Sequence, residues 1–157
     1  MQLAKSLSPF SISHPNLLNE VTIKHDAFVT TARIKLCQFW DGQFIPEMAL
    51  QRSSRNEIPD GLFIFPSGRE VVLEVENSDK GKSRFCRLLN RWQDQPNTWL
   101  VLYVASNDSL YQILQRYLLG LKQKKAVGLI LESELRNNES KIWTPWGLSQ
   151  PFLKRVC

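Results

Sequence analysis

Three carboxylates are spaced so that they could hold a divalent metal ion. Asp60 follows Pro59, and Glu74 and Glu76 lie in the apolar stretch Val-Val-Leu-Glu-Val-Glu at residues 71–76. In an extended strand alternate side chains point to one face, so Glu74 and Glu76 share a face that Val72 also occupies. Like charges repel at that separation, and burial raises the pKa of each carboxyl unless cations, hydrogen bonds or water compensate them. A bound Mg²⁺ or Mn²⁺ would activate a water nucleophile and stabilise phosphate charge, which is the chemistry of phosphodiester hydrolysis.

Basic residues follow directly after the carboxylates. Lys80 and Lys82 lie near the expected strand end, where either could orient the nucleophile or stabilise the transition state. A helix is predicted over residues 80–93, because apolar residues recur on one of its faces. Its other face carries basic residues without interleaved acids, which favours binding to a nucleic-acid backbone over simple solvation. The residues assigned to nucleic-acid binding are Lys80, Lys82, Arg84, Arg87 and Arg91.

A hairpin should bring Asp60 close to the glutamates. Two short apolar stretches, 62–65 and 71–76, are joined by Pro66-Ser67-Gly68, which is a strong turn signal. Antiparallel pairing of these strands returns Glu74 and Glu76 to the neighbourhood of Asp60.

The remaining pattern predicts an α/β fold with a mixed central β-sheet flanked by helices. Two buried strands with a helix between them should form a parallel crossover. The C-terminal segment, 133–157, shows no regular pattern, and Trp143 and Trp146 within it are expected to dock it onto the domain. The expected elements are a helix over 15–36, a hairpin over 37–50 turning at Asp41-Gly42, a loop over 52–57, a strand over 99–105, a helix over 107–121 capped by Asn107 or Asp108, and a strand over 126–131.

The carboxylate pattern resembles the PD-(D/E)xK nuclease superfamily. Pro59-Asp60 matches the first half of the motif and Glu74-Val75-Glu76 the second. The resemblance implies a restriction-endonuclease-like core with Asp60, Glu74 and Glu76 as catalytic metal ligands. Here Glu76 stands where the motif usually has lysine, which leaves Lys80 and Lys82 as candidates for a migrated lysine. Because the superfamily commonly draws an acid from its first helix, the resemblance also suggests Glu20 as a metal ligand, with Asp26 as the rival.

Within that superfamily, a longer stretch looks like plasmid mobilisation relaxases of the MobC type and related replication-relaxation proteins. The matching residues are Ile-Pro-Asp-Gly-Leu-Phe at 58–63 and Leu-Glu-Val-Glu-Asn-Ser-Asp-Lys at 73–80. This resemblance implies a DNA nickase or relaxase that works with other mobilisation or recombination proteins. A nick needs one active site, whereas a double-strand cut needs two and hence a homodimer or a second subunit. Both outcomes stay open.

Composition bounds these hypotheses. The 157 residues, 43% of them hydrophobic, suit one domain spanning 1–157, and the formal charge of +5 favours a polyanionic partner such as DNA. Three separated cysteines and two histidines offer little material for a zinc site or a serine triad. No apolar run approaches the roughly 20 residues that span a bilayer, so a cytoplasmic protein without a membrane partner is expected.

Other interpretations compete with the nuclease hypothesis. Pro59-Asp60-Gly61 is also an ordinary turn sequence, and Glu74 and Glu76 could face solvent on an antiparallel strand. A catalytically inactive DNA-binding or partner-docking module on the same fold is the main alternative function. An interaction domain with no nucleic-acid role is the third.

Overall fold

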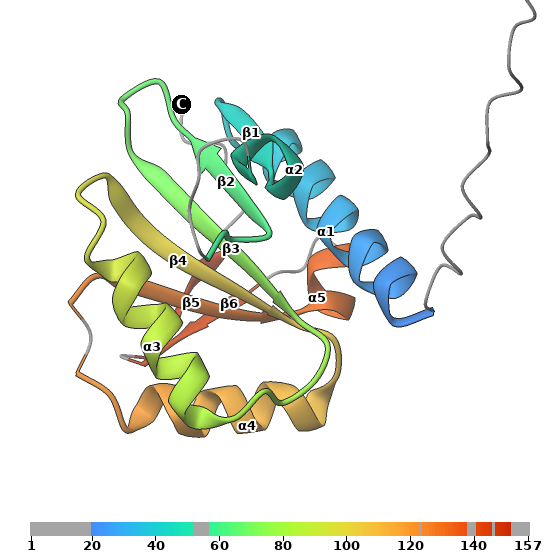
Figure 1. The fold of residues 1–157 in the computed structure, drawn as a ribbon, viewed down its shortest axis with the longest axis vertical. Helices are drawn as coiled ribbons and strands as arrows, with labels where there is room; N and C mark the ends of the chain where they lie inside the picture. Colours follow the sequence, from blue (N-terminus) through green and yellow to red (C-terminus); the bar gives the residue numbers. More distant parts are fainter. Residues whose placement is uncertain (1–19, 52–56, 123, 138–140, 146, 152–157) are drawn as a thin grey trace, which may run out of the picture.

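The computed structural model describes residues 20–51, 57–122, 124–137, 141–145 and 147–151. Helices and strands alternate along much of this part of the chain (Figure 1). In chain order the elements are α1 (Glu20–Phe39), β1 (Gln43–Pro46), α2 (Glu47–Leu50), β2 (Gly61–Ile64), β3 (Glu70–Glu76), α3 (Lys82–Gln93), β4 (Thr98–Ala105), α4 (Asp108–Leu119), β5 (Ala126–Leu131), α5 (Glu132–Arg136), β6 (Lys141–Thr144) and β7 (Gly147–Pro151).

The strands form one mixed sheet in which spatial order equals chain order, from β1 to β7. The pairs β3–β4 and β4–β5 are parallel. Helix α3 connects β3 to β4, and helix α4 connects β4 to β5. The other neighbouring pairs are antiparallel. The expected mixed α/β sheet flanked by helices, and its parallel crossover, are therefore confirmed.

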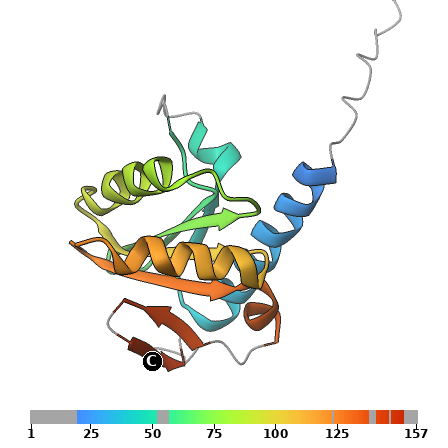
Figure 2. The ribbon, with the colours of Figure 1, turned by 90° about the horizontal axis from the view of Figure 1, so that it is seen from below.

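Helices cover both faces of the sheet (Figures 1 and 2). On one face the α1 side chains Phe28, Ala32 and Leu36 pack against inward-pointing residues of β3 and β4. On the other face α3 and α4 pack against a second cluster, which includes Val72 of β3 and Tyr103 of β4. The long apolar strands are buried on both sides, as parallel strands between helices must be.

The hairpin predicted at 37–50 is wrong, because α1 continues through Phe39. Phe28, Ala32, Leu36 and Trp40 recur every four residues and are all buried, so the apolar stripe of α1 extends to Trp40. Asp41-Gly42 therefore joins α1 to β1 instead of turning between two strands. Strand β1 pairs with β2, and the residues after it form the short helix α2.

The hairpin of β2 and β3 and the elements after it follow the prediction closely. Strand β2 pairs antiparallel with β3, and Gly68 adopts a positive φ of 79° in the turn between them. Asn107 caps α4, because its side-chain Oδ1 accepts a hydrogen bond from the backbone N–H of Leu110 at 3.0 Å. Helix α3 begins at Lys82, two residues later than expected. The first residues of the predicted N-terminal helix, 15–19, and most of the predicted loop, 52–56, lie outside the described residues.

The C-terminal segment is more regular than expected. It contains α5, whose Leu135 is fully buried, and the hairpin of β6 and β7, which extends the sheet beyond β5. Trp143 packs against the cluster on the α3 and α4 face, which confirms its docking role, whereas Trp146 lies outside the described residues. None of the described helices is long and apolar enough to cross a membrane.

Candidate functional site

The carboxylates lie at the carboxyl end of β3. Strand β2 begins at Gly61 opposite Leu73, so the last residues of β3 extend past the β2 ladder. The backbone N–H of Val75 donates instead to Asp60 Oδ2, at 2.6 Å. The Asp60 side chain thus continues the hairpin where the backbone of β2 ends. The sequence prediction that this hairpin brings Asp60 to the glutamates is met.

Glu74 and Glu76 point into the face that α3 covers. Their side chains are only 8% and 6% exposed, so the interpretation in which they face solvent is wrong. Glu74 Oε1 accepts a hydrogen bond from Trp92 Nε1 at 2.7 Å. Trp92 comes from α3, which means that the helix packing on the sheet also orients this carboxylate.

The charges of both Asp60 and Glu76 act on the Glu74 carboxyl. Burial raises the pKa of Glu74 well above its usual range, and the negative charges of Asp60 and Glu76 raise it further. Burial also raises the pKa of Glu76, although the positive charge of Lys80 opposes this. Repulsion among buried carboxylates is the condition that a divalent cation relieves.

Two buried polar atoms, one paired with a glutamate in the sheet and one next to a glutamate in the sequence, have no hydrogen-bond partner among the described residues. One is the hydroxyl of Tyr103, which is paired with Glu74 across β3 and β4, and the other is Oδ1 of Asn77, the residue after Glu76. Unpaired buried polar atoms commonly mark a place that water or an ion fills. Together with the oxygen-only donor set, these atoms fit a hard, hydrated cation such as Mg²⁺ or Mn²⁺.

The carboxylates do not form a complete ligand sphere by themselves. In the described part of the chain no three His, Cys, Asp or Glu side chains are gathered closely enough to hold a metal ion. In this arrangement fewer than three of them would ligate one ion. Such a site is still ordinary for Mg²⁺, which usually keeps several waters and binds one or two carboxylates together with substrate phosphates.

The two candidate lysines differ in position. Lys80 Nζ lies 3.0 Å from Glu76 Oε2, at the site. Its loop is held by the Asp79 carboxylate, which accepts hydrogen bonds from the backbone N–H of Gly81 at 2.8 Å and from the hydroxyl of Tyr117. Lys82 Nζ instead lies beside Gly120 at the end of α4, where a Cβ on Gly120 would be 3.5 Å from it. The geometry therefore favours Lys80.

The arginines of α3 are less available than the sequence indicated. Arg87 and Arg91 both form ion pairs with Glu57, which lies outside the helix, and the Arg91–Glu57 distance is 3.0 Å. The expectation of a basic stripe without acidic partners is wrong for these two residues. Arg84 is exposed in the first turn of α3, and its charge opposes the rise in the pKa of Glu76.

The contribution of α1 differs from the expected one. Glu20 is exposed at the first residue of α1, and its rival Asp26 is exposed as well. His25, to which the sequence analysis gave no role, places its Nε2 3.0 Å from Asp60 Oδ1. This hydrogen bond raises the pKa of His25, although partial burial opposes the shift. A contact across 35 residues leaves no local sequence signal, and only the position of His25 on the helix before the motif could have suggested it.

The unpaired hydroxyl of Tyr103 gives a test of how the site is filled. In the metal-free protein we expect Tyr103→Phe to leave the free energy of unfolding unchanged or to raise it by up to about 1 kcal/mol, because an unpaired buried hydroxyl is costly. Urea unfolding measures this. Tyr117→Phe is the matched control, since the Tyr117 hydroxyl donates to Asp79. A clear loss of stability in metal-free Tyr103→Phe would instead indicate that water bonds to that hydroxyl.

The arrangement as a whole offers two buried glutamates, a hydrogen-bonded aspartate and a lysine, all where β3 emerges from the ladder with β2. These groups can hold a cation and stabilise negative charge on a substrate. Comparison of the chain with protein-family models, with curated proteins and with solved structures gives no match.

Proposed function

We propose that this protein is a Mg²⁺- or Mn²⁺-dependent nuclease that hydrolyses DNA phosphodiester bonds at the carboxylates of β3. The observation that carries the proposal is the burial of Glu74 and Glu76 beside Asp60, where burial and the charges of Asp60 and Glu76 raise the pKa of Glu74. Burying carboxylates is costly unless cations offset their charge, and in the described structure Lys80 is the basic side chain that pairs with the two glutamates, through Glu76.

Each residue of the site would have a role that follows from its position. Glu74 and Glu76 would hold the cation. Asp60, which directly precedes β2, would add a further negative charge near it. A divalent ion held there would lower the pKa of a water molecule and would offset charge on the phosphate. Lys80 would stabilise the charge that develops on the phosphate oxygens, and Arg84 would contact the DNA backbone. The motif resemblance supports two more specific proposals. The fold would be a PD-(D/E)xK core, and the enzyme would be the relaxase of a mobile element.

The proposal is tested by incubating supercoiled plasmid with the protein and Mg²⁺ or Mn²⁺. Metal-dependent conversion to open circles, prevented by EDTA, is the expected result. Linear product appearing together with open circles would indicate paired active sites. Absence of cleavage with both metals, by a folded preparation that binds DNA, would contradict the proposal.

A second candidate, a catalytically inactive DNA-binding module, is favoured by one specific observation. Asp60 and Glu74 each accept hydrogen bonds from protein donors, and Glu76 is ion-paired with Lys80, so several of the carboxylate oxygens are already engaged. Calorimetric titration with Mn²⁺ separates the two functions. Salt-dependent DNA binding without any metal binding would support the inactive module.

The choice between the two lysines has a direct test. We expect Lys80→Met to slow plasmid cleavage by about a hundredfold, the effect of removing one group that stabilises transition-state charge. Lys82→Met should slow it by less than about threefold, because its ammonium group lies beside α4. Both variants lose one positive charge, so their metal-free affinity for DNA should fall equally. A slower Lys82→Met would reassign the role to Lys82.

A further inference from the structure

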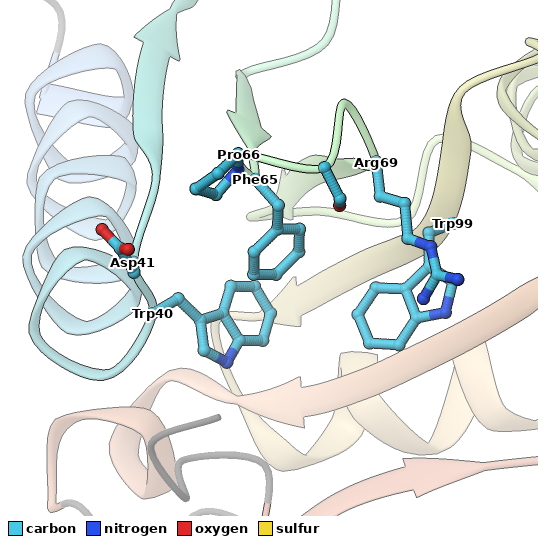
Figure 3. Close-up of a pocket in the computed structure, with 7 residues that line it drawn as sticks. Trp40, Asp41, Phe65, Pro66, Arg69 and Trp99 are labelled. Carbon is cyan, nitrogen blue, oxygen red and sulfur yellow. The ribbon is translucent and has the colours of Figure 1, made fainter. Parts of the chain in front are cut away.

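A pocket of about 420 Å³ opens near the start of β3, at the opposite end of that strand from the carboxylates (Figure 3). Trp40 and Phe65 line one side of it, and Trp99 and Arg69 line the other. Because β3 has seven residues, the pocket lies roughly 20 Å from Glu76 along the strand. It is therefore separate from the proposed cleavage site.

An irregularity in the sheet gives Trp99 its place in the pocket. Glu70 pairs with Thr98 but Val71 pairs with Leu100, which leaves Trp99 as an extra residue of β4. Bulges of this kind re-aim a side chain. The Trp99 indole is 44% exposed, whereas the neighbouring Leu100 is 6% exposed.

The aromatic walls are held in place by the core. The Trp40 side chain is 6% exposed, and its ring centroid lies 5.2 Å from that of Phe65. The Phe65 centroid is in turn 5.9 Å from that of Trp99, with the rings nearly perpendicular. Trp40 and Phe65 thus give the pocket flat apolar surfaces that pack against the core.

A polar hollow adjoins the aromatic pocket. It shares Ser67, Arg69 and Trp99 with the pocket and is completed by Gly68 and residues 96–98. Arg69 is exposed at the boundary between the two spaces, and no ion pair involves it among the described residues. A flat apolar space beside a polar one with an available guanidinium matches the two parts of a nucleotide, a stacking base and a charged phosphate.

We propose that this pocket binds an unpaired nucleobase of a single-stranded nucleic acid, with Arg69 contacting the adjoining phosphate. The net charge of +5 also suits this polyanionic ligand. The site goes beyond the proposed cleavage reaction and does not require it. A protein that carries both would hold an unpaired strand at one end of β3 while its carboxylates act at the other end.

The test measures binding of two fluorescein-labelled 12-nucleotide probes to the metal-free protein by anisotropy. One probe is oligothymidylate, and the other has the same backbone without bases. We expect Trp99→Ala to weaken oligothymidylate binding about tenfold, the usual order of one stacked base, and to leave the abasic probe unaffected. Trp99→Phe, which keeps a smaller ring, should recover part of the affinity.

Arg69→Gln is compared with Arg116→Gln, which removes an exposed charge from α4 far along the chain from the pocket. The Arg69 variant should lose more affinity for oligothymidylate than the Arg116 variant. Equal affinity of the parent for the two probes, unchanged binding by Trp99→Ala, or no binding by the parent at low salt would each overturn the proposal. The anisotropy assay contains no metal, so its result does not depend on cleavage. Binding of oligothymidylate through Trp99, together with no plasmid cleavage in Mg²⁺ or Mn²⁺, would contradict only the nuclease proposal.

Discussion

Glu74→Gln is expected to reduce metal-dependent plasmid cleavage by more than about a hundredfold. Changes to groups that merely support a metal ligand cost 10–100-fold in activity, and Glu74 is proposed as a ligand itself. Glutamine keeps an oxygen that can accept the hydrogen bond from Trp92 Nε1, so the packing of α3 should survive. Initial rates of open-circle formation at several Mn²⁺ concentrations measure the effect.

The stability of the same variant provides its control. The pKa of Glu74 in the folded protein is well above its ordinary value of 4.5, so the folded state binds the proton more tightly than the unfolded state. The stability of the parent must therefore fall as the pH rises from about 4.5 toward the folded-state pKa. Metal-free Glu74→Gln lacks this loss and should exceed the parent in unfolding free energy at pH 8. A variant that neither cleaves nor folds would leave Glu74 with a structural role only.

Trp92→Ala is expected to have the largest effect on stability, about 3–5 kcal/mol lost from the free energy of unfolding. The Trp92 side chain is 2% exposed, and its removal leaves a large cavity between α3 and the sheet. It also leaves Oε1 of the buried Glu74 without its hydrogen-bond donor. Urea unfolding of the metal-free protein measures the loss.

Trp92→Phe separates the two contributions, because it keeps most of the aromatic volume and removes only the N–H group. Combining it with Glu74→Leu, which removes the accepting oxygen, gives a double-mutant cycle for the hydrogen bond between the two side chains. A coupling energy near zero would mean that Trp92 stabilises the fold by packing alone, and it would no longer be regarded as positioning Glu74.

The parts of the fold that could be predicted are those with strong local signals. The turn at Pro66-Ser67-Gly68, between two short apolar stretches, defines the β2–β3 hairpin, and that hairpin places Asp60 beside the glutamates. Continuous apolar runs identified β4 and β5, because parallel strands buried on both faces need no polar alternation. The apolar face of α3 could likewise be recognised from its helical spacing.

The features that were not predicted from the sequence are those that depend on long-range packing. Phe39 and Trp40 suggested a strand by residue type, yet Trp40 continues the apolar stripe of α1 against the sheet. The ion pairs of Arg87 and Arg91 depend on Glu57, which is 30 residues or more away in sequence. No local sequence pattern predicts the contact of His25 with Asp60 or the irregularity at Trp99. Both depend on the assembled sheet.

The identity of spatial and chain order in the sheet has a consequence for how the protein folds. Every strand pairs with its neighbours in sequence, so no strand has to insert between two others that have already paired. Contacts between nearby segments form with a low entropy cost of loop closure, and topologies rich in them fold quickly. The contact between Asp60 and Val75 spans only 15 residues, within the β2–β3 hairpin. We therefore expect the hairpin that carries the carboxylates to form before β6 and β7 complete the sheet. Hydrogen exchange measured during refolding should show that the Val75 amide is protected early.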